Sequence, residues 1–302
     1  MDLESKIILI YGPTASGKTE FAIKLAKKVN GQIINADSMQ VYKEFKILTA
    51  RPLKKDTREI KHHLYGFKEA KKNFSVGDWL NLAEKKIKMI RKNKQIPILV
   101  GGTGLYFRAI IKGLVEIPVI PNKVRSKIRA LHKKIGQKNF YKKLIKIDPL
   151  VCKNIEPADI QRSLRAYEVK FYTKKSIFEW YKQTKSKFKR KDFLKIFMNF
   201  PRLKLIDRIN LRTKKMIEIG SIQEVKKFLR LKVPKNKSVS KAIGIFEIKD
   251  LIQNKLSKEQ VIEKISIKTR QYAKRQVTWA RGNMKDWKKI EPKKLESFIK
   301  KF

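Results

Sequence analysis

The sequence predicts an α/β protein in which a parallel sheet carries helices on both faces and is interrupted by a helical insertion. Short apolar runs at Ile7–Ile10, Gln32–Ala36 and Ile96–Val100 alternate with amphipathic segments, which is the pattern of a parallel sheet. From residue 116 to 195 the strand signals fade, and basic helical patterns punctuated by prolines replace them. A further apolar run, Ile196–Phe200, predicts a return to the sheet.

This pattern predicts two domains. Residues 1–115 and 196–302 would form the core, and residues 116–195 would form a basic helical insertion domain. A chain of 302 residues is long enough to bury a core of this size. The apolar periodicity predicts helices at Glu20–Val29, Trp79–Lys92, Asn122–Lys134, Lys138–Ile147, Ala158–Lys170, Arg202–Ile219 and Ile262–Arg281, and a turn or helix start at Val239–Ile245.

The charge is strongly positive. The chain has 75 Lys and Arg against 27 Asp and Glu, a formal net charge of +48. A positive field of this size favours a polyanionic partner, because each phosphate that a cation neutralises releases condensed counterions. A base composition that favours lysine codons is an alternative source of part of this excess. Nucleic acid is the partner that we expect.

Cys152 is the single cysteine, so the chain can form no internal disulfide and no cysteine metal cluster. The N-terminal residues show no signal-peptide pattern, and no stretch approaches the roughly 20 apolar residues of a membrane span. We therefore expect a cytoplasmic protein that does not enter a membrane.

A phosphate-binding motif follows the first predicted strand. It fits G-x-x-x-x-G-K-[ST] and consists of Gly12, Pro13, Thr14, Ala15, Ser16, Gly17, Lys18 and Thr19. The strand before it and the helix after it are the context of a P-loop, so the core is predicted to be P-loop NTPase-like. Lys18 is expected to reach the outer phosphate of a diphosphate or triphosphate, and the Thr19 hydroxyl to bind Mg²⁺.

Polar residues also follow the second and third strands. Asp37 comes directly after the second strand, where it could bind Mg²⁺, cap a helix or act as a general base. The third strand ends in Gly101-Gly102-Thr103, whereas most P-loop NTPases carry a Mg²⁺-binding Asp there. An ordinary ATPase is therefore disfavoured. Thr103 would share a crevice with Asp37 and Lys18, or would belong to a tight turn with no chemical role.

The two adjacent histidines, His62 and His63, lie in a basic segment predicted to be a loop, 49–72. Adjacent side chains point in different directions, and no further ligand follows at metal-binding spacing. We expect hydrogen-bonded or solvated histidines rather than a metal site.

Arginine pairs recur at helical spacing, and each pair could be a solvated face or a phosphate clamp. The pairs are Arg125 with Arg129, Arg162 with Arg165, and Arg208 with Arg212. The C-terminal helix interleaves cations with Tyr272 and Trp279, a composition that suits single-stranded RNA. The alternative is that Val277 and Trp279 pack inward and the Lys and Arg side chains are only solvated.

Five segments occur in the order and spacing of one family: GPTASGKT, ADSMQVYK, VGGTGLYF, QRSLRA and KRQVTWAR. Together they resemble the tRNA dimethylallyltransferases, also called tRNA isopentenyltransferases, over most of the chain. The resemblance implies transfer of a dimethylallyl group from dimethylallyl diphosphate to N6 of the adenosine at tRNA position 37, next to the anticodon. That base would be flipped into a channel through the protein.

The resemblance also implies roles for individual residues. Asp37 would accept the N6 proton, Thr103 would contact the target nucleotide or the donor near it, and Lys18, Arg208 and Mg²⁺ at Thr19 would neutralise the diphosphate. The residues expected to contact tRNA are Asp37, Ser38, Met39, Gln40, Thr103, Arg125, Gln161, Arg162, Ser163, Leu164, Arg165, Lys241, Gly244, Lys274, Arg275, Gln276, Thr278, Trp279 and Arg281. The chain departs from the family pattern at Ile245 and Phe246.

Three other functions fit parts of the sequence. A small-molecule kinase would use the same P-loop, and an adenylate isopentenyltransferase would prenylate free AMP, ADP or ATP. An RNA-binding protein with a relic P-loop would bind tRNA without modifying it. The expected partners of the chain are tRNA and dimethylallyl diphosphate, and the expected state is a monomer.

Overall fold

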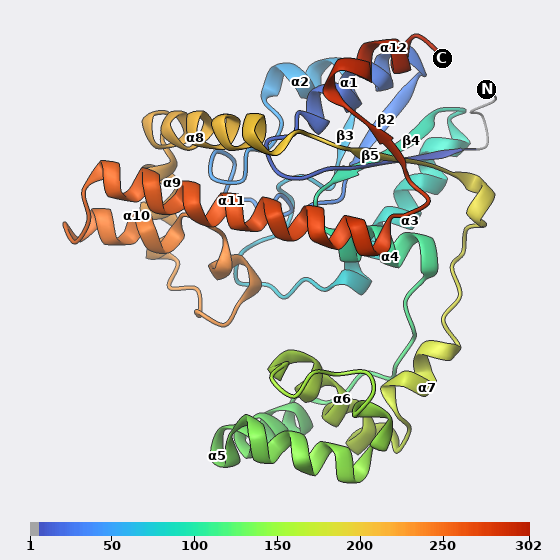
Figure 1. Ribbon diagram of the computed structural model, residues 1–302, viewed down its shortest axis with the longest axis vertical. Helices are drawn as coiled ribbons and strands as arrows, with labels where there is room; N and C mark the ends of the chain where they lie inside the picture. Colours follow the sequence, from blue (N-terminus) through green and yellow to red (C-terminus); the bar gives the residue numbers. More distant parts are fainter. Residues whose placement is uncertain (1–5) are drawn as a thin grey trace. The chain divides into compact units, whose positions relative to one another are not determined.

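The chain divides into two compact units. The computed structural model describes residues 6–302, except for the side chains of Lys54 and Lys55. Unit 1 contains the described residues up to Ile111 together with Phe188–Phe302, and unit 2 is Lys112–Lys187 (Figure 1). The predicted boundaries fall at 115/116 and 195/196. The second boundary differs because the strand predicted at Ile196–Phe200 begins earlier, at Phe193.

A parallel sheet forms the centre of unit 1, as the sequence predicts. Its six strands run in the order β3-β2-β4-β1-β5-β6. They are β1 (Ile7–Tyr11), β2 (Gly31–Asn35), β3 (His62–His63), β4 (Ile96–Gly101), β5 (Phe193–Met198) and β6 (Lys288–Ile290). Ile8 of the central strand lies opposite Ile98 of β4 and Leu194 of β5.

Helices cover both faces of the sheet because successive strand residues point to opposite sides. Ile8 and Ile10 pack against α1 and α12. Tyr11 points the other way, and its ring meets Phe107 of α4 edge-on at 5.6 Å. Figure 1 shows α1 and α12 on one side of the sheet and α3 and α4 on the other. These helices are α1 (Lys18–Lys28), α3 (Val76–Lys92), α4 (Gly104–Lys112) and α12 (Leu295–Ile299).

The segment predicted to be a loop, 49–72, contains regular secondary structure. It contains α2 (Lys54–Glu59) and strand β3, in which His62 and His63 pair with Ile33 and Ile34. A strand of two residues carries too little alternation to be recognised in a sequence.

Four further helices of unit 1 surround a second apolar core. They are α8 (Arg202–Glu218), α9 (Ser221–Arg230), α10 (Ile245–Ile252) and α11 (Lys258–Asn283). Phe45, Met216, Phe228, Ile248 and Ile265 meet in this core. Phe45 follows β2 in the chain, so the core joins the helices to the loop that carries Asp37.

Unit 2 is helical, as the sequence predicts. It contains α5 (Asn122–Ile147), α6 (Ile160–Thr173) and α7 (Ile177–Lys182), packed around a core that includes Tyr141, Leu144 and Val169. Gly136 has φ 72° and breaks α5 into two helical segments, which agrees with the two helices predicted at Asn122–Lys134 and Lys138–Ile147. In the described part of the chain, no helix has both the length and the apolar character that a bilayer crossing needs.

Candidate active site

Three loops meet at the carboxyl ends of neighbouring strands. The P-loop follows β1, Asp37 follows β2, and the Gly101–Gly104 turn follows β4. Backbone hydrogen bonds tie the loops together: Gly12 N donates to Gly101 O at 3.3 Å, and Thr103 N donates to Ala36 O at 3.2 Å. A Cβ on Gly101 would lie 2.0 Å from Ala36 O, so only glycine allows this approach. The structure therefore brings together the three loops that the sequence singled out.

The P-loop lysine lies against its own loop. Lys18 Nζ donates a hydrogen bond to Pro13 O at 3.2 Å. Arg208 of α8 is close, since a Cβ placed on Gly17 would lie 3.4 Å from its Nη2. Arg208 is exposed, and its guanidinium also stacks over the Phe200 ring. Both cations thus lie against the P-loop.

A buried asparagine holds the Asp37 loop, and sequence reasoning missed it. Asn35 is fully buried; its Nδ2 donates to Asp37 O and Leu64 O, each at 3.0 Å, and its Oδ1 accepts from Asp37 N at 2.9 Å. The Asp37 Oδ1 atom accepts from Met39 N at 2.9 Å. The next helix along the chain is α2, which begins at Lys54, so the suggestion that Asp37 caps a helix is wrong.

The Thr103 hydroxyl is bonded to the same loop. Its Oγ1 accepts from Ser38 N at 2.9 Å and donates to Ser38 Oγ at 3.2 Å. Thr103 therefore holds Ser38 directly beside Asp37, which gives this threonine a positioning role in the structure.

A cavity of about 320 Å³ opens beside Asp37. It is lined by residues of the P-loop, the Asp37 loop, α8, the segment before α10, and α11. Among them are Thr14, Asp37, Ser38, Met39, Thr49, Arg212, Lys241, Tyr272 and Arg275. Arg212 lines this cavity and Arg208 does not. The spacing of the two arginines indicated a pair on α8, but Arg212 was not chosen from the sequence as a site residue.

The charges around Asp37 influence one another. Burial lowers the pKa of Lys18 to about 8; the Asp37 carboxylate acts in the opposite direction, and Arg212 lowers the pKa further. Burial also lowers the pKa of Arg212, and Asp37 again opposes the shift. Burial, and then Asp37, raise the pKa of the Tyr11 and Tyr272 hydroxyls. The Asp37 carboxylate is thus close enough to act electrostatically on two cations and two tyrosine hydroxyls.

Gln276 was predicted to contact tRNA, but it is buried and hydrogen-bonded inside the protein. Its Oε1 accepts from Thr14 N at 2.8 Å, and its Nε2 donates to Gly102 O at 2.9 Å. The Tyr11 hydroxyl donates to Gln276 O at 2.9 Å. The prediction of a surface contact is therefore corrected: Gln276 joins α11 to the P-loop and to the glycine turn.

The other predicted residues of α11 divide between surface and core. Lys274, Arg275, Thr278 and Arg281 are exposed, as an RNA-binding face requires. Trp279 packs against the glycine turn, since a Cβ on Gly104 would lie 2.4 Å from Trp279 Cε3. The indole therefore packs inward, as one alternative from the sequence has it, and RNA binding by the exposed cations stays a prediction.

The segment around Gly244 is less accessible than predicted. Gly244 is buried with φ 105°, and a Cβ there would lie 2.6 Å from Leu48 Cδ1. Its expected tRNA contact is therefore corrected to packing against the Asp37 loop. Ile245 belongs to the core and Phe246 is exposed, whereas Lys241 is exposed and lines the cavity.

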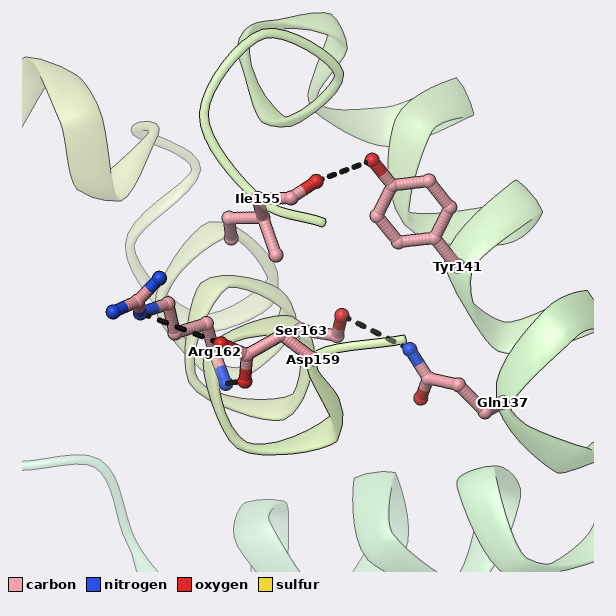
Figure 2. Close-up of polar contacts among 6 residues, drawn as sticks. All are labelled: Gln137, Tyr141, Ile155, Asp159, Arg162 and Ser163. Atoms are coloured by element: carbon pink, nitrogen blue, oxygen red, sulfur yellow. Dashed lines mark hydrogen bonds and ion pairs between the residues drawn. The ribbon is translucent and has the colours of Figure 1, made fainter. Parts of the chain in front are cut away.

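In unit 2, the predicted tRNA-binding segment starts α6 (Figure 2). Arg162 is exposed; its N donates to Asp159 Oδ1 at 3.0 Å, and its Nε lies 3.5 Å from Asp159 Oδ2. Ser163 is fully buried and accepts a hydrogen bond from Gln137 Nε2 at 3.2 Å, so its predicted contact is corrected to internal packing. Gln161 is exposed and Leu164 partly buried.

The histidines are hydrogen-bonded: His62 Nδ1 lies 2.6 Å from Ile60 O, and His63 Nε2 lies 2.6 Å from Gln32 Oε1. Among the residues described, no group of three or more His, Cys, Asp or Glu side chains could hold a metal ion. The P-loop offers hydroxyl oxygens instead. Thr19 is partly buried, and the Ser16 Oγ is buried without a hydrogen-bond partner. Hard oxygen donors beside a diphosphate fit Mg²⁺.

Comparison with known proteins shows the family of this chain. A family model described as IPP transferase matches residues 40–283. A tRNA dimethylallyltransferase of Pelagibacter ubique is 58% identical over 301 residues, covering 100% of this chain and 96% of the relative. Another, from Allorhizobium ampelinum, is 39% identical over 287 residues and covers 94% of each chain.

Solved structures agree. The crystal structure of a tRNA delta(2)-isopentenylpyrophosphate transferase from Staphylococcus epidermidis superposes with a TM-score of 0.68 at 32% identity, covering 98% of this chain and 96% of that one. A eukaryotic dimethylallyltransferase acting on tRNA gives a TM-score of 0.83 at 29% identity, with 95% and 73% covered.

Proposed function

Since this chain belongs to the IPP transferase family, we propose the complete reaction and the residues that carry it. The chain is an enzyme that transfers a dimethylallyl group to an adenosine of tRNA. The proposed donor is dimethylallyl diphosphate, and the proposed acceptor is N6 of the adenosine at tRNA position 37. The products are then N6-dimethylallyladenosine and diphosphate.

The observation that carries this proposal is the arrangement of the P-loop, Asp37 and Arg212 at one cavity. Thr14 of the P-loop, Asp37 and Arg212 line the cavity, and Lys18 is close enough to interact electrostatically with the last two. The P-loop would bind phosphates with backbone N–H groups and Lys18, while Asp37 follows β2, which only β4 separates from the P-loop strand β1. A diphosphate and a carboxylate base are the two groups that prenyl transfer to an amine needs. The Gly101-Gly102-Thr103 turn at the end of β4 supplies no carboxylate for hydrolysis.

The proposed bond changes use these groups directly. The adenosine N6 attacks C1 of the dimethylallyl group, the C1–O bond breaks, and the electron pair leaves on the diphosphate. Asp37 accepts the proton that N6 loses. Lys18 and Arg208, and Arg212 from the cavity wall, stabilise the negative charge that grows on the leaving group. Thr103 fixes Ser38 and thereby the Asp37 loop.

Mg²⁺ is the proposed cofactor. The Thr19 hydroxyl would hold it together with diphosphate oxygens, and the unpaired Ser16 hydroxyl lies in the same loop. When bound, the ion supplies further charge neutralisation to the leaving diphosphate.

The proposed tRNA-binding surface uses the exposed cations of α11 in unit 1 and the arginines of α5 and α6 in unit 2. Flipping a base out of its stack costs a few kcal/mol, which phosphate contacts around the anticodon loop offset. The formal net charge of +48 suits such a partner. We further propose that the enzyme acts as a monomer in the cytoplasm, where its tRNA substrate occurs.

Mass spectrometry of nucleosides tests the reaction. Unmodified tRNA is incubated with the protein, Mg²⁺ and dimethylallyl diphosphate, then digested. N6-dimethylallyladenosine in the digest, dependent on the donor, is the expected result. Replacing tRNA with AMP separates the enzyme from an adenylate isopentenyltransferase, and labelled ATP with small acceptors separates it from a kinase. Binding of tRNA without a product would contradict the proposal.

Arg165→Ala is expected to weaken tRNA binding and to leave the KM for dimethylallyl diphosphate unchanged. Arg165 is only partly exposed on α6, yet its side chain retains 38% of its accessible surface, enough to meet a phosphate. Loss of one phosphate contact lowers the slope of log K against log salt by about 1. Binding measured at several salt concentrations checks this, and an unchanged slope would exclude Arg165 as a phosphate contact.

Gln276→Leu is expected to lower kcat/KM for the donor by roughly tenfold to a hundredfold, since each buried polar group left unpaired costs about 1–3 kcal/mol. Thr14 N and Gly102 O are the two groups that would lose their partner. Gln271→Leu, at an exposed position of the same helix, is the matched control. The kcat/KM for the donor is measured for both variants, after thermal unfolding has shown that they are equally stable. Equal kcat/KM values for the two variants would contradict the prediction.

A further inference from the structure

One buried carboxylate in unit 2 is surrounded by three arginines. Glu168 on α6 is 3% exposed. Its carboxylate oxygens lie 3.4 Å from Arg125 Nε, 3.6 Å from Arg129 Nε and 3.8 Å from Arg165 Nη1. Arg125 and Arg129 belong to α5, and Arg165 belongs to α6, so the carboxylate joins cations from two helices.

The four side chains differ in accessibility. The side chains of Arg125, Arg129 and Arg165 keep 40%, 59% and 38% of their accessible surface, against 3% for Glu168. The carboxylate is therefore the inner group and the guanidiniums are the outer ones. Three cations around one anion leave a net charge of +2 that faces solvent.

Without the carboxylate these arginines would repel one another. Burial, and then the charge of Arg125, lower the pKa of Arg165, and Glu168 opposes that shift. Guanidinium groups bind phosphate oxygens through planar, paired N–H donors, so their mutual orientation decides whether they can grip one phosphate or two neighbouring ones. Burying an acidic side chain is costly unless charges pair with it, as they do here.

We propose that Glu168 is a positioning residue that holds Arg125, Arg129 and Arg165 as one clamp for the phosphate backbone of tRNA. The inference rests on the proposed function, which supplies the polyanion, and it adds Arg129 and Glu168 to the residues expected from the sequence. Glu168 itself does not touch the RNA. Glu168 fixes the arginine side chains in the conformations that bind the phosphates.

The test uses a substitution for which charge and positioning predict opposite results. Glu168→Gln raises the net charge of the protein by one, so a purely electrostatic effect would tighten tRNA binding and steepen its salt dependence. Loss of positioning predicts the reverse: binding weaker by roughly tenfold, and a log–log salt slope shallower by about 1 to 2. Glu156→Gln, an exposed change of equal charge in unit 2, is the control and should bind at least as tightly as wild type.

Thermal unfolding and circular dichroism establish whether Glu168→Gln keeps unit 2 folded. If it does not, Arg129→Gln carries the test, since this exposed arginine should account for about one phosphate in the salt slope. Wild-type affinity and slope in the folded Glu168→Gln enzyme, or an unchanged slope in Arg129→Gln, would overturn the inference. Failure of the proposed function is distinct, because wild type itself would then give no prenylated nucleoside.

Discussion

Asp37→Asn is expected to bind tRNA almost as tightly as wild type and to transfer the prenyl group two to four orders of magnitude more slowly, the usual range for loss of a general base. An asparagine Oδ1 can still accept the hydrogen bond from Met39 N, and Asn35 still holds the backbone of residue 37. The loop geometry is therefore kept, and the missing function is acceptance of the N6 proton.

Single-turnover transfer with saturating tRNA and donor measures this effect. Asp207→Asn, an exposed change of equal charge on α8, is the matched control. A transfer rate within a few-fold of wild type would remove Asp37 from the role of base. A loss that appears only in tRNA affinity would assign it to binding.

The parts of the fold that the sequence predicted correctly are those with strong local patterns. Strands β1, β2 and β4 are buried apolar runs, and each is followed by a loop of distinctive composition. Strands β3 and β6 were missed because they have two and three residues and carry charged or imidazole side chains. Their strand conformation comes from pairing with β2 and β5, which is a tertiary effect.

Among the site residues too, local motifs were predicted correctly and tertiary contacts were not. The motifs identified Lys18 and Asp37, and the structure brings together their loops, which follow β1 and β2 on either side of β4. The sequence could not show whether Arg208 or Arg212 lines the cavity. The two residues are four apart on one helix, and the way α8 packs decides which of them points into the cavity. Gln276 looked like a surface residue among exposed cations. Only its contacts with Thr14 and Gly102, far away in the chain, reveal its buried position.

These contacts also relate the two proposed substrates. Gln276 hydrogen-bonds the P-loop from within α11, the helix whose exposed cations are proposed to bind tRNA. The donor loop and the acceptor-binding helix therefore share one hydrogen-bonded contact. A displacement of α11 would therefore disturb the hydrogen bond that Thr14 N donates to Gln276 Oε1.

The kcat/KM for the donor is expected to fall about tenfold per pH unit above the pKa of Lys18, which burial lowers to about 8. Rates at donor concentrations well below KM measure this ratio. The diphosphate requires the ammonium form. Because the folded pKa lies below the ordinary Lys value, that form is lost on raising the pH through about 8, and the rate falls on the alkaline side.

Two substitutions separate this titration from other causes of an alkaline loss. Lys18→Met should lower kcat/KM by roughly two to three orders of magnitude at pH 7, the range for removing one preorganised group that stabilises developing charge. Lys18→Arg keeps a cation that stays protonated throughout this range, so whatever its absolute rate, its profile should stay flat where the wild-type rate falls. A wild-type profile that is flat to pH 9.5, or an equal fall in Lys18→Arg, would show that Lys18 does not titrate in this range.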